Sequence, residues 1–457
     1  MQREGFSSGK NFVLASVAAS VGLGNVMRFP GLCAKYGGGA FILIYFLALI
    51  ILGVPMLCTE IALGRRCKKS APFALKSLYK PMEAVGWLAL LNSLIVAIFY
   101  VAIIGWLAQA TINIFPFCND NQTLSLKDIS GYFVKNVLKF NADGAIALSP
   151  ILTVLTLVAW VVIYFCIKGG ASSLSKISRF TVFIPIGLFT ALALRGLLYG
   201  NSLLALKALF VPDFSALKSV ELWQTALGQA FFSLSVLAGV MPAYGSFLPA
   251  KAKIFPSAIV VALADFGVSV LASVAFFTAV YGCGLQGAIT DSALTTAFSV
   301  YPVAIAKLFP NNSVISGIFG VLFYLSIILI ALQSTLSMIE AVVVAVKERF
   351  TFIKARAIAC IILPSAVLSL AFCTNYGQFL VQIFDDIVNR YLILIVGALE
   401  CVALMIYGDY DQILKEINAN CGKISMPKSP FKLSLKYLCP TVIFALILVL
   451  IITVIIG

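Results

Sequence analysis

The sequence predicts an all-α membrane protein whose chain crosses the bilayer about eleven times, with interruptions in the first and the sixth crossing. Hydrophobic residues make up 61% of the 457 residues and charged residues only 11%. Runs of about 20 apolar residues, each long enough to cross a hydrocarbon core of ~30 Å, recur from residue 11 onward. Small and polar residues interrupt the first and the sixth run at mid-membrane depth.

The loops between these runs predict how the chain is oriented. The predicted spans cover residues 11–31, 38–62, 83–112, 149–168, 176–199, 223–248, 255–282, 315–346, 354–374, 380–407 and 434–456. Most cations follow even-numbered spans, and the loop after span 2 alone holds Arg65, Arg66, Lys68, Lys69, Lys76 and Lys80. The positive-inside rule therefore places the amino terminus in the cytoplasm of a cell (inner or plasma) membrane, and the odd number of spans places Gly457 outside.

Residue types argue against several classes of function. The formal charge of +14 is spread over loops of a membrane protein, so no nucleic-acid partner is expected. Histidine is absent, and no nucleotide-binding loop, nucleophile–base pair or metal-ligand cluster is visible. We therefore expect that the protein is not an enzyme. A channel would need a ring or a repeated filter, and the sequence contains neither.

The interruption in span 1 lies in residues 16–30. Gly22 and Gly24 weaken a helix there and are followed by Asn25, Arg28 and Pro30. In hydrocarbon, an opened backbone is tolerated only where it lines a cavity or is buried in protein. The alternative interpretation is close helix packing through small residues.

Span 6 decides between these interpretations. Its stretch Gly228–Gly239 is again small and polar, and it occupies the corresponding place in a second group of five spans. Because five is odd, the second group is inverted relative to the first. Paired interruptions in inverted halves favour a transporter whose site lies between them. We expect one transporter domain over 1–457, with repeats at 1–200 and 201–410 and a linker plus the eleventh helix at 411–457.

Five motifs carry a resemblance over essentially the whole chain. They are Val21–Pro30, Gly37–Phe41 with Tyr45, Gly53–Pro55 with Glu60–Arg66, Gly228–Gln229 with Ser235, and Ala331–Ser337. On these motifs the chain resembles the neurotransmitter:sodium symporter family, in particular its eleven-span bacterial amino acid transporters. The resemblance implies the leucine-transporter fold, a 5+5 inverted-repeat helical bundle with broken helices 1 and 6 and one extra C-terminal transmembrane helix. It also implies alternating access, with a neutral amino acid moved together with sodium.

The resemblance places the solute at the two interruptions. Main-chain amides of Leu23 and Gly24 would meet the carboxylate of the amino acid at a helix amino end, and the Tyr100 hydroxyl would donate to the same group. The ammonium would be accepted by carbonyls near Ser20, Phe232 and Ser233.

The side-chain pocket implied by the resemblance would be lined by Val96, Phe232, Ser235, Ala238, Ser334 and Met338. Gly22 stands where monoamine carriers of the family have an aspartate, which favours a solute that brings its own carboxylate. Ala238 stands where a bulky residue is common. We therefore expect a roomy pocket for a large aliphatic or aromatic amino acid.

The family implies two sodium sites, and this chain departs from the pattern in both. The first would use the Ser20 carbonyl, Asn25, Ser233 and the solute carboxylate, with Asp265 in place of the usual asparagine. Asp265 either strengthens cation binding or is protonated and couples transport to protons. An intramembrane aspartate is a functional residue by default.

The second sodium site would use the carbonyls of Ala18, Val21 and Ile330 and the hydroxyl of Ser334. Gln333 replaces the usual threonine. Its amide oxygen could ligate sodium, or its NH2 group could fill the space instead.

The chloride positions of animal members correspond to Tyr45, Gln229, Ser233 and Ser269. Chloride-independent bacterial members carry a carboxylate at the position of Ser269, and here Asp265 lies one helical turn earlier on the same face. Either chloride binds, or Asp265 supplies the negative charge itself. We favour the second alternative, because an ionised aspartate would repel chloride.

The family also implies two gates. Arg28 would pair with Asp386, or with its neighbour Asp385, above the solute, with Phe232 as a lid. Arg3 would pair with Glu348 on the cytoplasmic side, with Phe6 and Tyr244 packed nearby. Two alternative functions stay open: a proton-coupled or sodium-independent transporter, and a substrate-sensing membrane protein. The formation of a homodimer also stays open.

Overall fold

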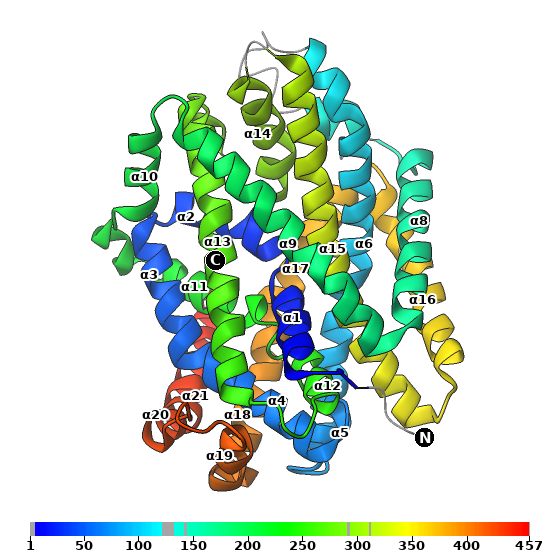
Figure 1. The fold of residues 1–457 in the computed structure, drawn as a ribbon, viewed down its shortest axis with the longest axis vertical. Helices are drawn as coiled ribbons and strands as arrows, with labels where there is room; N and C mark the ends of the chain where they lie inside the picture. Colours follow the sequence, from blue (N-terminus) through cyan, green and yellow to red (C-terminus); the bar gives the residue numbers. More distant parts are fainter. Residues whose placement is uncertain (1–4, 121–131, 141–143, 290–292, 310–311, 457) are drawn as a thin grey trace.

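The computed structural model describes residues 5–120, 132–140, 144–289, 293–309 and 312–456. Within these ranges the chain is helical almost throughout, and its only β pairings are two isolated bridges, Gly38 with Pro212 and Leu148 with Thr374. Figure 1 shows the helices as one upright bundle, with α1 (Gly9–Ser20), α6 (Met82–Asp120) and α15 (Ser313–Phe350) inside it.

The helices of the first half follow the predicted spans closely. They are α1 and α2 (Phe29–Lys35), joined by the π-helical turn η1 (Gly24–Arg28); α3 (Gly39–Ala48), η2 (Leu49–Gly53) and α4 (Val54–Cys67); α6; α8 (Pro150–Lys168); and α9 (Gly170–Leu197). Two short helices on opposite sides are α5 (Ala71–Lys76) and α10 (Ser202–Phe210).

The second half repeats this order. It contains α11 (Val220–Ser233) and α12 (Val240–Ser246); α13 (Ile254–Gly282); α14 (Ala293–Leu308); α15; α16 (Lys354–Ser369) with η6 (Leu370–Cys373); α17 (Gly377–Asp386), η7 (Ile387–Leu392) and α18 (Ile393–Tyr407); α19 (Tyr410–Asn418); and α20 (Lys428–Leu433), η8 (Ser434–Leu438) and α21 (Cys439–Ile456).

The number of membrane spans agrees with the sequence once the broken ones are considered. Nine uninterrupted spans in the described residues are long and apolar enough to cross a membrane, and Gly9–Ser20 with Gly24–Lys35 forms a tenth, bent by 50°. The remaining predicted span, span 6, is divided into α11 and α12, which have only 14 and 7 residues. Both predicted interruptions are therefore present.

The break in span 1 follows from its glycines and from one side chain. After Ser20 the chain leaves the helix, and Asn25 folds back so that its Oδ1 accepts the N–H of Gly22 at 2.8 Å. This bond satisfies a backbone donor that the broken helix leaves open. The chain then resumes as η1, in which the N–H of Phe29 bonds to the carbonyl of Gly24.

A side chain of a neighbouring span stabilises the break in span 6. Ser235, Leu237 and Gly239 all adopt left-handed backbone conformations, with φ of 54°, 65° and 71°. The N–H of Leu237 donates to Oε1 of Glu60 at 2.7 Å, and Glu60 is buried in α4. The carboxylate thus replaces the helical partner that this N–H has lost.

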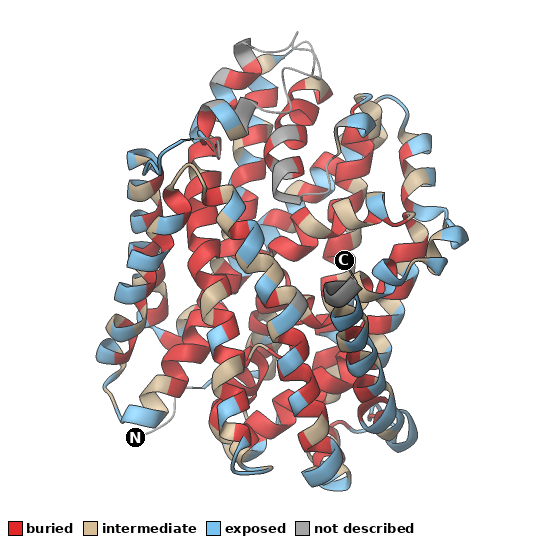
Figure 2. Ribbon diagram, turned by 180° about the vertical axis from the view of Figure 1, so that it is seen from behind, coloured by how far each residue is buried: buried red, intermediate tan, exposed pale blue. Residues whose placement is uncertain are grey.

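The helices that carry the breaks pack without room for larger side chains. A Cβ atom on Gly64 of α4 would lie 2.0 Å from the carbonyl oxygen of Pro242 in α12. Glycine at this position therefore lets the second half of span 6 lie directly on span 2. Figure 2 shows buried residues concentrated in the interior helices and exposed residues on the outer helix faces.

The two ends of the bundle differ in charge. Figure 1 places α5, α12, α19 and α20 at one end and α14 at the other. The end with α5 carries the cation-rich loop after span 2, which includes Arg65 and Lys68.

Candidate solute and ion site

A cavity of about 880 Å³ reaches the break in span 1. Leu23 and Gly24 of the break, Tyr100 of α6 and Phe232 of α11 all line it. These four residues are among those predicted to bind the solute. A Cβ atom on Gly24 would lie 3.2 Å from Nε2 of Gln229 and 3.3 Å from the Phe232 ring, so the backbone lies directly against both side chains.

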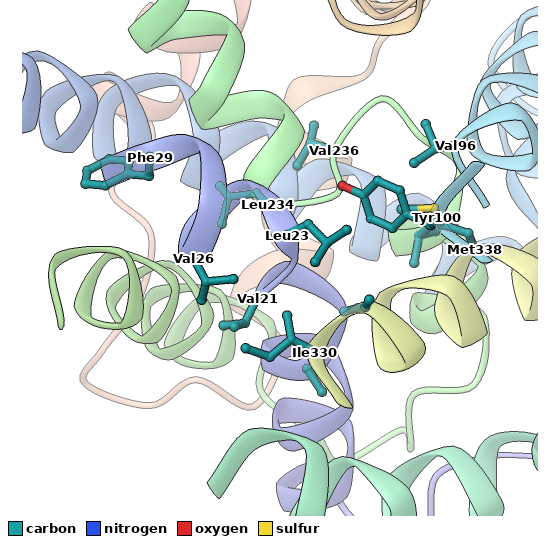
Figure 3. Packing of buried hydrophobic residues seen from close by; sticks show 14 of the residues in the cluster. Val21, Leu23, Val26, Phe29, Val96, Tyr100, Leu234, Val236, Ile330 and Met338 are labelled. Carbon is teal, nitrogen blue, oxygen red and sulfur yellow. The ribbon is translucent and has the colours of Figure 1, made fainter. Parts of the chain in front are cut away.

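The deeper predicted residues lie around the broken backbone. Figure 3 shows Val96, Tyr100 and Met338 gathered opposite Leu23 and Val21, with the Tyr100 hydroxyl on the side where Leu23 and Val236 lie. Within the described chain, the other predicted solute residues do not belong to the lining of the 880 Å³ cavity; they are Ser20, Val96, Ser233, Ser235, Ala238, Ser334 and Met338.

Three of these serines hold the break in span 1. Oγ of Ser235 donates to the Ala19 carbonyl at 2.9 Å, and Oγ of Ser334 donates to the Val21 carbonyl at 3.3 Å. Ser20 donates to the carbonyl one turn earlier in its own helix. The carbonyls that the break releases are therefore met by hydroxyls from span 6 and span 8.

Asp265 is the centre of a buried polar cluster. It lies in α13 with no exposed surface. Its Oδ1 accepts hydrogen bonds from Oγ of Ser233 at 2.6 Å and from Nδ2 of Asn25 at 2.8 Å. Its Oδ2 accepts the hydroxyl of Tyr45 at 2.5 Å. Three donors from three different spans thus converge on one buried carboxylate, and hydrogen bonds of this kind stabilise its ionised form.

This cluster contains most of the predicted chloride residues. Tyr45 and Ser233 bond to Asp265 directly, and Ser269 accepts a hydrogen bond from Nδ2 of Asn25 at 2.8 Å. Gln229 instead donates to the carbonyl of Gly24 at 3.3 Å. The carboxylate of Asp265 therefore lies among the groups that were expected to surround an anion.

The residues predicted for the second sodium site meet between α1 and α15. The bond from Ser334 to the Val21 carbonyl joins the two helices there. Oε1 of Gln333 accepts the hydroxyl of Thr181 at 3.2 Å, whereas its Nε2 is buried without a hydrogen-bond partner among the described residues. Thr181 of span 5 was not predicted. Its role depends on a contact across 152 residues, which no local pattern reveals.

The residues predicted for the outer gate lie on one cavity. Arg28, Asp385 and Asp386 all line it, together with Phe232, the predicted lid. The structure therefore brings the two sides of the predicted outer gate to the same cavity.

The opposite side of the site is closed by aromatic side chains. The rings of Phe6 and Tyr244 pack edge to face with centroids 5.5 Å apart, and both side chains are buried. The Tyr244 hydroxyl donates to Oγ of Ser337 at 2.8 Å. Oε2 of Glu348 accepts the N–H and the hydroxyl of Ser70, while its predicted partner Arg3 lies outside the described residues.

An arginine for which no role was predicted closes the same side. Arg65 of α4 is buried; its Nε donates to Oε1 of Glu416 in α19, and its guanidinium also reaches the carbonyl of Ala252 at 2.8 Å. It therefore joins span 2, the loop before span 7 and the helix after span 10. Its sequence signals were its place in the motif Glu60–Arg66 and in the cation-rich segment after predicted span 2, and neither indicated these distant partners.

The comparisons with known proteins agree over the whole chain. The model of the sodium:neurotransmitter symporter family matches residues 3–119 and 116–456. The chain belongs to this family.

Individual relatives support the same assignment. An uncharacterized sodium-dependent transporter, MJ1319, of Methanocaldococcus jannaschii is 32% identical over 423 residues, which cover 92% of this chain and 85% of the relative. The sodium- and chloride-dependent taurine transporter of Canis lupus familiaris is 27% identical, with 90% and 73% covered.

The fold has a close match among solved structures. The crystal structure of MhsT in complex with L-phenylalanine has a TM-score of 0.83, with 23% sequence identity and coverage of 98% of this chain and 99% of the other. The predicted fold is therefore confirmed. As a family member the chain is a multi-pass membrane protein that carries a small solute together with sodium.

Proposed function

We propose that this symporter imports a neutral amino acid with a large aliphatic or aromatic side chain, coupled to sodium and without a requirement for chloride. The observation that carries the proposal is the opened backbone at Leu23 and Gly24, which lies with Tyr100 and Phe232 on one cavity. Backbone amides at the start of a helical turn and a phenol hydroxyl suit a carboxylate.

The absence of an acidic side chain at Gly22 supports an amino acid over a monoamine. A solute amine without its own carboxylate would leave the amides of the break unmatched. A Cβ atom on Gly22 would lie 3.1 Å from Oγ of Ser334, so this position also has little room for an acidic side chain. The structural neighbour MhsT, which is described in complex with L-phenylalanine, supports a large side chain.

The Asp265 cluster supports independence from chloride. A fixed carboxylate among Tyr45, Ser233 and Asn25 supplies one negative charge beside the proposed first sodium site. A second anion in the same cluster would be repelled. Because the same carboxylate could bind a proton, proton movement in addition to sodium is the second candidate.

We also propose that the closed, cation-rich side faces the cytoplasm and that the cavity opens to the outside. Arg65 and Lys68 lie at the closed side, where Lys68 donates to the carbonyl of Leu248 at 3.0 Å. Cations near span ends favour the cytoplasmic side. The function is then uptake through an outward-open state, with no chemical reaction catalysed.

Uptake by proteoliposomes tests these points together. Radiolabelled L-leucine or L-phenylalanine should accumulate under an inward sodium gradient, and replacing chloride by gluconate should change the rate less than twofold. A competition panel should rank leucine, tryptophan and tyrosine above glycine and alanine. Preference for glycine, taurine or a monoamine would refute the proposed solute, and uptake driven equally well without sodium would refute the coupling.

A further inference from the structure

Tyr301 connects the outer helix α14 to the interrupted part of span 1. Its side chain is only 4% exposed, and its hydroxyl donates to the carbonyl of Val26 at 3.3 Å. Its ring lies 5.1 Å from that of Phe276 in α13 and 4.6 Å from that of Phe323 in α15, measured between centroids. The phenol is thus fixed between two spans and directed at the backbone of η1.

The carbonyl that it reaches lacks the donor that a regular α-helix would supply. In an α-helix the carbonyl of residue 26 accepts from the N–H of residue 30, and residue 30 is proline, which has no N–H. Val26 instead lies in the π-helical turn η1, where the N–H of Phe29 bonds to the carbonyl of Gly24, five residues earlier. The hydroxyl of Tyr301 supplies a hydrogen-bond donor to the Val26 carbonyl within this turn. Burial raises the pKa of Tyr301, so the hydroxyl keeps its proton.

The segment held in this way carries the residues proposed to bind solute and sodium. η1 spans Gly24–Arg28 and contains Val26 at its centre. Gly24 and Arg28 line the cavity, and Asn25 donates a hydrogen bond to Asp265. A shift of η1 would displace all three groups together.

We propose that Tyr301 is a positioning residue for the solute and sodium site, acting through the carbonyl of Val26, whose α-helical donor is absent because residue 30 is proline. Its hydroxyl holds η1 in the orientation that presents Gly24 and Asn25. The inference rests on the proposed function for the solute, whereas its sodium readout requires only the sodium coupling of the family.

The test is a double-mutant cycle between Tyr301→Phe and Pro30→Ala. Tyr301→Phe keeps the ring and removes the donor. It should raise two quantities about fivefold, equivalent to about 1 kcal/mol: the sodium concentration that gives half-maximal thermal stabilisation, and the KM for L-leucine or L-phenylalanine. The maximal rate of uptake should change less. Pro30→Ala returns an N–H to the Val26 carbonyl, so Tyr301→Phe should change the same quantities less than twofold in that background. Tyr164→Phe in α8, which removes a hydroxyl far along the chain from this contact, is the matched control.

The outcomes separate the alternatives. An unchanged sodium response in Tyr301→Phe overturns the inference, as does an equal fivefold effect with and without Pro30. If Pro30→Ala cannot be purified, the sodium titration of Tyr301→Phe against Tyr164→Phe decides alone. A wild-type protein that is stabilised by sodium but transports neither amino acid refutes the proposed solute, and Tyr301 is still tested through sodium.

Discussion

The proposed ion requirement depends on the side chain of Asp265. A buried carboxylate within a membrane span is expensive unless it is hydrogen-bonded or paired. Here Ser233, Asn25 and Tyr45 all donate to it, and no cationic side chain takes part in these bonds. The charge is therefore available to a bound sodium ion.

Replacing this carboxylate should create a need for chloride. In Asp265→Ser the hydroxyls of Tyr45, Ser233 and Ser269 lose their anionic partner and can surround a chloride ion. Uptake in chloride-free buffer should fall at least about tenfold, since a charge-assisted hydrogen bond contributes about 1.5–3 kcal/mol, and chloride should restore part of it. Ser273→Ala, about two turns after Asp265 in the same helix, is the control and should keep wild-type uptake. Chloride-independent uptake by Asp265→Ser would contradict the assignment.

Tyr100 provides a second test at the level of one residue. It lines the cavity together with Leu23 and Gly24. Tyr100→Phe should raise the KM for the amino acid about tenfold or more, because a hydrogen bond to a carboxylate is lost, with little change in thermal stability without solute. Concentration-dependent uptake measures this change. An unaltered KM would show that the Tyr100 hydroxyl does not bind the carboxylate of the amino acid.

At the scale of helices, the contact between α4 and α12 depends on a missing side chain. A Cβ atom on Gly64 would overlap the Pro242 carbonyl, so Gly64→Ala must push the two helices apart. We expect a loss of about 1–3 kcal/mol, as for other overpacked positions, seen as a lower unfolding temperature. Gly187→Ala in α9, where a Cβ atom meets nothing within 4 Å, is the control and should be neutral or stabilising. Equal stability of the two variants would show that the helices can separate freely.

The sequence predicted the helices and both breaks because these depend on local patterns. Long apolar runs define spans, and the small and polar stretches at Gly22–Gly24 and Gly228–Gly239 together indicate the two breaks. The partners that stabilise the breaks could not be predicted. Glu60 reaches Leu237 across 177 residues, and Tyr301 reaches Val26 across 275. Such contacts follow from the packing of distant spans, and no spacing in the chain encodes them.

At the scale of the whole molecule, the two sides of the site are unequal. The cavity lies on the side of Arg28 and the aspartates of α17, whereas the opposite side is closed by Phe6, Tyr244 and the bonds of Arg65. In the proposed orientation this arrangement is an outward-open state, which sodium and solute enter from one side only.

Sodium should stabilise this state as a whole. Any ligand that binds only the folded protein raises its stability, by about 2.7 kcal/mol at a concentration 100 times its Kd. The unfolding temperature should therefore rise with sodium chloride or sodium gluconate and not with potassium chloride at equal ionic strength. A rise that depends on chloride instead of sodium would contradict both the ion assignment and the role of Asp265.

The backbone of the span 6 break has a consequence for how selectivity can change. Ser235 and Leu237 are left-handed without being glycine, a conformation that costs about 1–2 kcal/mol per residue and persists only when neighbours enforce it. The enforcing contacts come from Glu60 and the Ala19 carbonyl, which belong to spans 2 and 1. The backbone conformation at Ser235 and Leu237, and with it the shape of the pocket, thus depends partly on Glu60 and the Ala19 carbonyl. Random mutagenesis confined to pocket-lining positions would overlook them, and altered solute preference should also arise from substitutions in span 2.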